Sequence, residues 1–246
     1  DMHDCLLEER KLEQITFDGG RVYRDHNGYE YTSVTSFLGS FSKAGIDAWR
    51  RSVGEEVANQ ISGKAARLGT RIHAYCETFL QDSISKQYTL PLEKKLKNTL
   101  RENPTEMNMF YSLRNCLIES ATSIYGIEIP LHSRTLGLAG TADLFCEWEG
   151  RPTIVDFKTS RRRKKKQWID NYFLQGTAYA MMAEELYDMK IPSVKIILLI
   201  ENIDKNDIIN KEILDNINTN NPKIKIWFYE RFMDRTLKNY FINKFI

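Results

Sequence analysis

No run of about 18 consecutive apolar residues occurs in this 246-residue sequence, so nothing in it is predicted to span a membrane. Residues 1–4 show neither a charged segment followed by an apolar one nor an Arg- and Ser-rich stretch, so no leader peptide is expected here. Neither sign of charge is in large excess, because 35 Lys and Arg face 33 Asp and Glu, for a formal net charge of +2. The total charge therefore indicates no partner, and its distribution along the chain is more informative.

Cysteine is scarce, and the four that occur are far apart: Cys5, Cys76, Cys116 and Cys146. No CxxC pair is present, so a zinc ribbon is not expected. An iron–sulfur cluster is not expected either, because its ligands form a clustered set of cysteines. Unpaired, dispersed cysteines favour a reducing intracellular compartment.

The length and the 42% hydrophobic content suffice for one core, so residues 1–246 are expected to form a single domain. Two turn signals, Gly19-Gly20 and Asn27-Gly28, divide the first segment into short β runs. We therefore expect residues 1–32 to form a small β-meander beside a core formed by residues 33–246.

Helical and β patterns alternate through the rest of the chain, which predicts an α/β fold with a mixed central β-sheet flanked by helices. Two early helices are expected to be separated near Ser62-Gly63, and residues 81–104 are expected to form a loop or a short charged helix. The expected helices are 46–60, 65–80, 104–125, 167–189 (the longest) and 230–245, and the expected strands are 128–132, 193–200 and 223–229.

A β-hairpin is predicted where residues 141–148 and 153–156 flank the turn sequence Glu-Gly-Arg-Pro. Because side chains alternate along a strand, Asp156 and Lys158 share one face and Phe157 points to the core. The turn would bring Asp143 beside Asp156. Two carboxylates that converge in this way suit Mg²⁺ or Mn²⁺.

An ordinary exposed hairpin would also account for these residues. Asp156 and Lys158 would then form a surface ion pair worth about 0 to 1 kcal/mol, without any catalytic role. The flanking sequence distinguishes the two interpretations.

Four short motifs occur in one order: Gly69-Thr-Arg-Ile-His73, Gly140-Thr-Ala-Asp143, Val155-Asp-Phe-Lys158-Thr and Gln175-Gly-Thr-Ala-Tyr179. Their order and spacing resemble the PD-(D/E)XK nuclease superfamily, with its restriction-endonuclease-like core, and in particular its RecB-like exonuclease branch. The resemblance covers residues 30–200 and is greatest to mitochondrial genome maintenance exonucleases and related phage exonucleases. One departure is Ala142, which stands where the superfamily's name has proline.

The resemblance implies a Mg²⁺- or Mn²⁺-dependent DNA exonuclease acting on single-stranded DNA with a free end, in replication, recombination or repair. It implies that His73, Asp143, Asp156 and the Phe157 carbonyl hold the metal, and that Lys158 positions the attacking water or neutralises charge. Without the resemblance, a lone histidine would be interpreted as structural.

Two acids near this set are interpreted more conservatively. Glu77 lies on the same face of the expected helix 65–80 as His73, where it either orients the imidazole or faces solvent. Glu128 lies either near the metal or on an edge strand, and the edge-strand interpretation is preferred.

Residues 161–166 are six consecutive cations, here called the basic segment. Such a run is either a solvated loop or a site that collects phosphates, and its place after the Lys158 strand favours phosphate binding. Stacking of bases on the rings of Trp168, Tyr172 and Phe173 would favour a single strand. A place in the core is the alternative for Tyr172 and Phe173, and it is preferred for Phe173. The candidate nucleic-acid-binding residues are Ser33, Thr35, Thr159, Ser160, Lys164, Lys165, Lys166, Trp168, Gln175 and Tyr179, with a helix-capping role preferred for Ser33 or Thr35.

Two other functions stay open: a non-catalytic nucleic-acid-binding module, and an endonuclease of the same fold. The complete Asp143, Asp156 and Lys158 set favours an enzyme. A monomer is expected, located in the host cytoplasm for a phage protein or in the mitochondrion for a mature organellar one. Strand polarity, selectivity between DNA and RNA, and the number of metal ions are not predicted.

Overall fold

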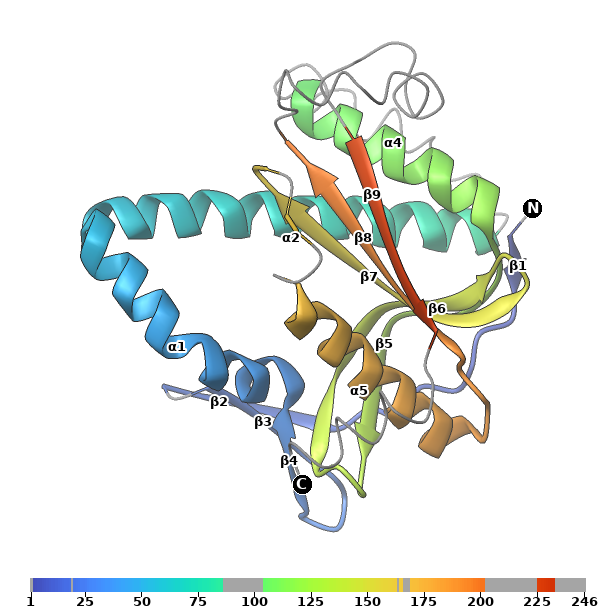
Figure 1. The fold of residues 1–246 in the computed structure, drawn as a ribbon. Helices are drawn as coiled ribbons and strands as arrows, with labels where there is room; N and C mark the ends of the chain where they lie inside the picture. The colour runs from blue at the N-terminus through green and yellow to red at the C-terminus, as the bar shows by residue number, and fades with distance from the viewer. Residues whose placement is uncertain are drawn as a thin grey trace.

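The computed structural model describes residues 2–18, 20–85, 104–162, 164–165, 169–201 and 225–232. Within them the chain folds as a mixed β-sheet flanked by helices, which confirms the expected α/β class (Figure 1). The helices are α1 (Val34–Val53), α2 (Glu55–Ser85), α4 (Pro104–Ser120) and α5 (Asp170–Tyr187). The strands are β1 (His3–Asp4), β2 (Glu13–Phe17), β3 (Gly20–Arg24), β4 (Glu30–Ser33), β5 (Ala121–Ser133), β6 (Leu138–Trp148), β7 (Arg151–Ser160), β8 (Ser193–Ile200) and β9 (Lys225–Phe232).

The strands pair in the order β2-β3-β4-β6-β7-β8-β9, and β5 pairs with β6 and with β1. Three pairs are parallel (β1 with β5, β4 with β6, and β7 with β8), and the other pairs are antiparallel. The predicted meander is present as β2, β3 and β4, and β4 joins it to the central sheet. The predicted hairpin is β6 and β7.

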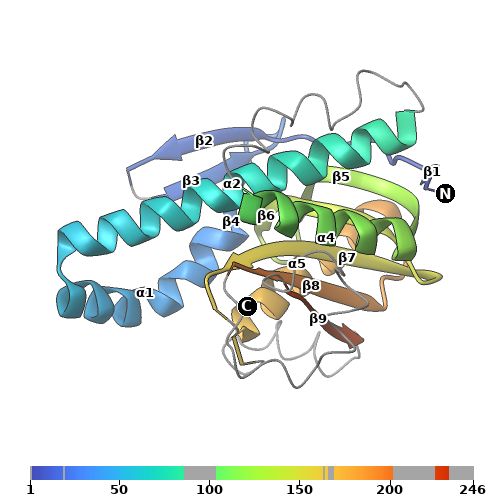
Figure 2. The same cartoon turned by 90° about the horizontal axis from the view of Figure 1, so that it is seen from above.

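Alternation along the strands gives the sheet two apolar faces, and helices cover both of them. Val155 and Phe157 pack with α2 and α4, whereas Ile154 packs with α5 and the first turns of α1. Figure 2 shows α2 and α4 side by side over one face. The expectation that Phe157 and Phe173 lie in the core is confirmed, because both side chains are buried.

The predicted break between the first two helices is wrong. Helix α2 runs without interruption through Ser62 and Gly63 and continues to Ser85. Of the segment predicted as a loop or a short charged helix, residues 81–85 are thus helical, and residues 86–103 lie outside the described residues. The chain turns instead at Gly54, whose φ of 87° lies in a region that glycine adopts without steric cost. A glycine such as Gly63 inside a helix costs only about 1 kcal/mol relative to alanine, which packing elsewhere offsets.

Three other boundaries also differ from the prediction. Helix α4 ends at Ser120, and residues 121–125 begin β5, because Ile124 pairs with Cys146 and both are buried in the core between the sheet and α4. Helix α5 has 18 residues and is shorter than α2, which has 31. Residues 230–232 belong to β9 rather than to a terminal helix, and the remainder of that prediction lies outside the described residues.

The strand predicted at residues 193–200 is confirmed as β8, and the one at 223–229 is confirmed over the part that β9 covers. None of the described helices has the length and apolar character needed to cross a bilayer.

Candidate active site

The site forms where β6 and β7 stop pairing with each other. Their registered pairs end at Leu144 and Val155, so the next residue of β6, Asp143, has no backbone partner in β7. Its side chain takes over that role, because Oδ2 of Asp143 accepts the backbone N–H of Phe157 at 2.7 Å. The two strands therefore separate while a buried carboxylate satisfies the freed donor.

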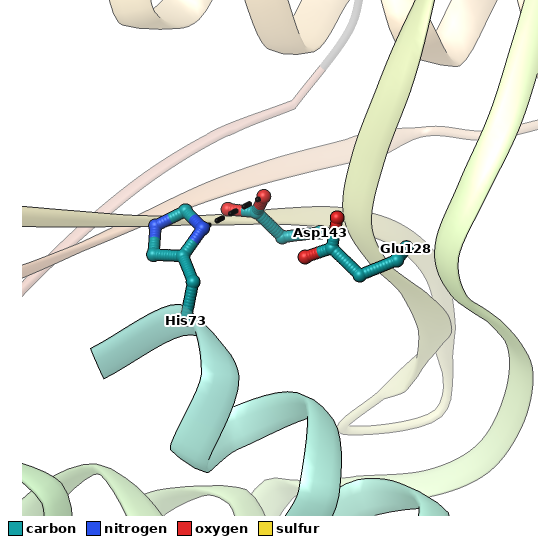
Figure 3. A group of neighbouring side chains, drawn as sticks. All are labelled: His73, Glu128 and Asp143. Atoms are coloured by element: carbon teal, nitrogen blue, oxygen red, sulfur yellow. Dashed lines mark ion pairs between the residues drawn. The ribbon is translucent and has the colours of Figure 1, made fainter. Parts of the chain in front are cut away.

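His73 approaches this point from α2. Its Nε2 lies 2.8 Å from the Phe157 carbonyl oxygen, and its Nδ1 lies 3.4 Å from Oδ1 of Asp143 (Figure 3). Because a carbonyl only accepts hydrogen bonds, Nε2 donates in this contact, and Nδ1 is the nitrogen directed at Asp143. A ring nitrogen that faces a carboxylate oxygen is attracted to it only if a proton or a cation lies between them.

Glu128 completes this group, which corrects its interpretation as an edge-strand acid. Strand β5 pairs Ile127 with Leu144 and Ile129 with Ala142, which places Glu128 opposite Asp143. Glu128 also has a φ of 46°, a left-handed conformation that is unfavourable for a residue with a side chain. One nitrogen or oxygen atom from each of His73, Glu128 and Asp143 lies within 4.8 Å of the others, and Figure 3 shows the three side chains pointing toward one another.

Asp156 and Lys158 lie together on β7, as the alternation of the strand predicts. Oδ2 of Asp156 is 2.8 Å from Nζ of Lys158, and both side chains are largely buried. Nζ of Lys158 also donates to Oε1 of Gln175 at 3.1 Å, and Nε2 of Gln175 donates to the Tyr179 hydroxyl at 3.1 Å. The fourth sequence motif therefore contacts the third through Lys158.

The electrostatics of the two acids in the group favour a cation. Burial raises the pKa of Asp143 well above its usual range, and the nearby carboxylate of Asp156 raises it further. Burial likewise raises the pKa of Glu128, and Glu77 and Asp156 add to that rise against the opposing effect of His73. A divalent cation at this point would offset both the burial and the repulsion.

Lys158 stays charged in this environment. Burial alone would lower the pKa of its ammonium, but the carboxylates of Asp156 and Asp143 outweigh burial and raise it. A fixed positive charge therefore lies beside the carboxylates.

The donor set fits a hard divalent metal ion, since it offers carboxylate oxygens and one imidazole nitrogen. Of the predicted ligands, the structure groups His73 with Asp143. Asp156 is not part of that group and pairs with Lys158 instead, whereas the Phe157 carbonyl accepts the His73 proton and retains a second lone pair. Glu128 is the ligand candidate that the sequence placed second to an edge-strand role, since its place opposite Asp143 depends on the register of β5.

Four of the predicted nucleic-acid-binding residues lie at the end of a strand or at the start of a helix. Thr159 and Ser160 end β7, and Thr159 lies close to Gly69 of α2. Ser33 occupies the N-cap position of α1 without a capping bond from its side chain, and its hydroxyl lies 3.0 Å from that of Thr35.

The structure gives the other predicted nucleic-acid-binding residues different surroundings. Lys164 donates to the Tyr172 hydroxyl at 2.8 Å, whereas Lys165 is exposed. Tyr179 is buried, which makes it a less direct nucleic-acid contact than expected. Lys166 and Trp168 lie outside the described residues.

Comparison with protein families agrees with this geometry. Residues 48–230 match the family model described as the PD-(D/E)XK nuclease superfamily. The chain belongs to this superfamily, whose nucleases use divalent metal ions.

Among solved structures, the chain is similar to a candidate exonuclease from Eubacterium rectale, with 10% sequence identity and a TM-score of 0.43. The matched region covers 72% of this chain and 63% of that protein, so the chain spans less than two thirds of its length. No curated protein matches the sequence.

Proposed function

We propose that the protein is a Mg²⁺- or Mn²⁺-dependent exonuclease of the RecB-like branch that hydrolyses DNA from a free end of a single strand. The observation that carries the proposal is the assembly of four separate motifs around one point. His73, Glu128 and Asp143 form the ligand group, while Gln175 reaches the same centre through Lys158. The free end and the single strand are what the resemblance of the four motifs to RecB-like exonucleases implies.

The residues have distinct roles in this proposal. A metal ion bound by His73, Glu128 and Asp143, with Asp156 beside them, would lower the pKa of an attacking water and stabilise negative charge on the phosphate. Lys158 supplies a second positive charge, which Asp156 and Gln175 hold in place. Because this charge is already oriented, it needs no rearrangement as charge develops on the phosphate.

The basic segment would bind the DNA backbone. Arg161, Arg162 and Lys165 are exposed and follow directly on β7, which carries Asp156 and Lys158. Phosphates held there would present the adjacent phosphodiester to the ligand group. Such an activity, from a chain that we propose is one monomeric domain, fits DNA replication, recombination or repair.

Release of labelled nucleotides from linear single-stranded DNA, with Mg²⁺ or Mn²⁺ and with EDTA, tests the proposal. Cleavage that requires metal and is lost in Asp143→Asn is expected, whereas the matched control Asp188→Asn, an exposed acid beyond α5, should retain it. Cleavage of a circular single strand would show an endonuclease instead. DNA binding without any cleavage would favour the non-catalytic module, and strands blocked at the 5′ or the 3′ end would reveal the polarity.

A further inference from the structure

Three polar or aromatic side chains on α5 form a stripe that faces Lys158. Tyr172, Gln175 and Tyr179 are spaced i, i+3 and i+7, so they lie on one side of the helix. The Tyr172 ring centroid lies 5.2 Å from Nζ of Lys158, within the range of a cation–π interaction. Gln175 accepts a hydrogen bond from the same ammonium.

Tyr172 also contacts the basic segment. Nζ of Lys164 donates to the Tyr172 hydroxyl at 2.8 Å and lies 5.2 Å from the centroid of its ring. One tyrosine thus contacts both the proposed catalytic ammonium and a cation of the proposed phosphate-binding segment. Arg161 and Arg162 are exposed on the same segment, whereas Lys164 is half-buried.

We infer that Tyr172 is a positioning residue for Lys158, and that Lys164, through the Tyr172 hydroxyl, holds the ring in place. The inference rests on the proposed function, because it assigns Tyr172 a role in the reaction attributed to Lys158. Tyr172 here acts through Lys158 and does not touch the scissile phosphate.

The need for such a residue follows from the chemistry of lysine. Its ammonium is a point charge on a flexible four-carbon stem, so a single ion pair leaves much of its motion unrestricted. Asp156 and Gln175 restrain Lys158 from two directions, and the ring of Tyr172 offers its negative face as a third restraint.

The Gln175 contact is itself oriented by the neighbouring strand. Because Nε2 of Gln175 donates to Tyr179, its Oε1 is the atom directed at Lys158. Tyr179 lies so close to β6 that a β-carbon on Gly140 would be 2.8 Å from its ring. The α5 stripe is therefore packed against the strand that carries Asp143, which gives Lys158 and Asp143 a common support.

Single-turnover cleavage at saturating DNA, together with DNA affinity in EDTA, tests the role of Tyr172. Tyr172→Leu removes the ring and should lower the cleavage rate about 10-fold, since an interaction of this class contributes roughly a factor of 2 to 30. The loss should be smaller than that of Lys158→Ala, and DNA affinity should change less than about 2-fold. Tyr172→Phe keeps the ring over Lys158 but loses the bond to Lys164, so its loss of rate should be measurable but smaller than that of Tyr172→Leu.

The role of Lys164 is tested by a double-mutant cycle. Tyr172→Phe and Lys164→Met each remove the same hydrogen bond, so the double variant should cleave no more slowly than the worse single variant. Additive losses would mean that Lys164 acts independently of Tyr172, and would overturn its proposed part.

A spectroscopic measurement tests the geometry without any cleavage. In the metal-free protein, the Tyr172 ring should shift the NMR signal of the Lys158 ε-methylene upfield, and Lys158→Met identifies that signal by its loss. The shift should persist in Tyr172→Phe and disappear in Tyr172→Leu. An unshifted wild-type signal would overturn the inference even if the protein cleaves DNA.

The matched control is Tyr187→Leu, at the far end of α5, where the tyrosine hydroxyl donates to the Glu8 carbonyl. It should cleave at the wild-type rate.

If Tyr172→Leu lowers DNA affinity at an unchanged rate, Tyr172 is a base-stacking contact. If it lowers only the melting temperature, Tyr172 is structural, and either result overturns the inference. A wild-type protein that releases no nucleotides would instead refute the proposed function. The two failures are distinguishable, because the NMR shift does not depend on cleavage.

Discussion

At the scale of single residues, Asp143 combines a structural and a chemical role that oppose each other. Its carboxylate replaces the backbone acceptor that Phe157 loses where β6 and β7 separate. The same position buries a negative charge near Asp156 and thereby raises its pKa. The ionised Asp143 carboxylate, which would bind the metal in the proposed reaction, thus lowers the stability of the metal-free fold.

Replacing Asp143 with Asn should abolish cleavage and raise the stability of the metal-free protein. A raised pKa in the folded state means that the ionised form costs stability, which is lost as the pH rises from the unfolded to the folded pKa. Asparagine remains neutral and can still accept the Phe157 N–H. In EDTA at pH 8 we expect a melting temperature higher by about 2 to 4 °C for each kcal/mol regained.

Melting curves at pH 5 and pH 8 check this expectation. The difference between the variant and the wild type should shrink at pH 5, where the Asp143 carboxyl is more protonated. A variant that melts below the wild type at both pH values would show that the charge of Asp143 stabilises the fold.

Glu128 should contribute to metal affinity, because its carboxylate lies in the group with His73 and Asp143. Glu128→Gln should weaken Mn²⁺ binding by about 10-fold or more, since loss of even an outer-shell partner costs roughly 10- to 100-fold. Calorimetric titration of the metal measures this directly. Glu119→Gln, at an exposed site on α4, is the control and should bind Mn²⁺ like the wild type; equal affinity in both variants would remove Glu128 from the ligand set.

Except for His73, which only the family resemblance indicated, the metal-site residues that the sequence predicted are those whose geometry is local. Asp156 and Lys158 share a face through the alternation of one strand, and a single turn brings Asp143 near them. Glu128 was given an edge-strand role first because its place near the metal depends on pairing between β5 and β6 with a register shift near Gly126. No spacing in the sequence encodes that shift.

At the scale of secondary-structure elements, α5 is positioned by close packing on β8. A β-carbon on Gly176 would lie 2.3 Å from Cγ1 of Val194, so the helix and the strand approach closely there. One residue earlier on the helix is Gln175, which contacts Lys158. The distance between α5 and the sheet thus determines whether Gln175 can accept the hydrogen bond from Lys158.

Gly176→Ala should therefore destabilise the protein and impair its activity together. Overpacking in a core typically costs about 1 to 3 kcal/mol, or roughly 2 to 4 °C in melting temperature per kcal/mol at this chain length. Gly45→Ala on α1 is the matched control, because its β-carbon would meet nothing within 4 Å. A helical alanine there should stabilise by about 0.5 to 1 kcal/mol.

Thermal melts and single-turnover rates below the melting transition check both variants. A Gly176→Ala protein as stable and active as the wild type would show that Val194 adjusts without moving α5.

The sequence predicted one buried strand correctly but placed two helix boundaries wrongly. The strand at residues 193–200 is an apolar run with buried side chains, which makes it readable without its partners. The segment at residues 121–125 continues a helical apolar spacing, and its pairing with β6 and β1 makes it extended. The turn at Gly54 was missed because glycines tolerated inside α2, such as Gly63, give the same local signal.

At the scale of the whole molecule, the sheet places charge and chemistry at one end of β7. Its turn end carries Arg151, whereas its other end carries Asp156 and Lys158 and leads into the basic segment. The net charge of +2 conceals this asymmetry. The order of the motifs indicated the family, and the alternation of helical and β patterns indicated the α/β class. Only the structure shows that Lys164 of the basic segment bonds to Tyr172 while Arg161, Arg162 and Lys165 are exposed.

The exposed cations of the basic segment should set the salt dependence of DNA binding. Phosphate contacts release counterions, and each contact on a single strand contributes about −0.7 to the slope of log K against log salt. Replacing Arg161, Arg162 and Lys165 by Ala should therefore make the slope shallower by about 2. Single-turnover cleavage at saturating DNA should change little, because Lys164 keeps its bond to Tyr172.

Binding isotherms at several salt concentrations, in EDTA so that no strand is cut, measure the slope. The control is a double variant, Arg151→Ala with Lys190→Ala, whose exposed cations lie at the opposite end of β7 and beyond α5. It should leave the slope unchanged, since neither site adjoins the ligand group. If the triple variant also keeps the wild-type slope, the basic segment is a solvated surface loop, and the DNA backbone must bind on another face of the molecule.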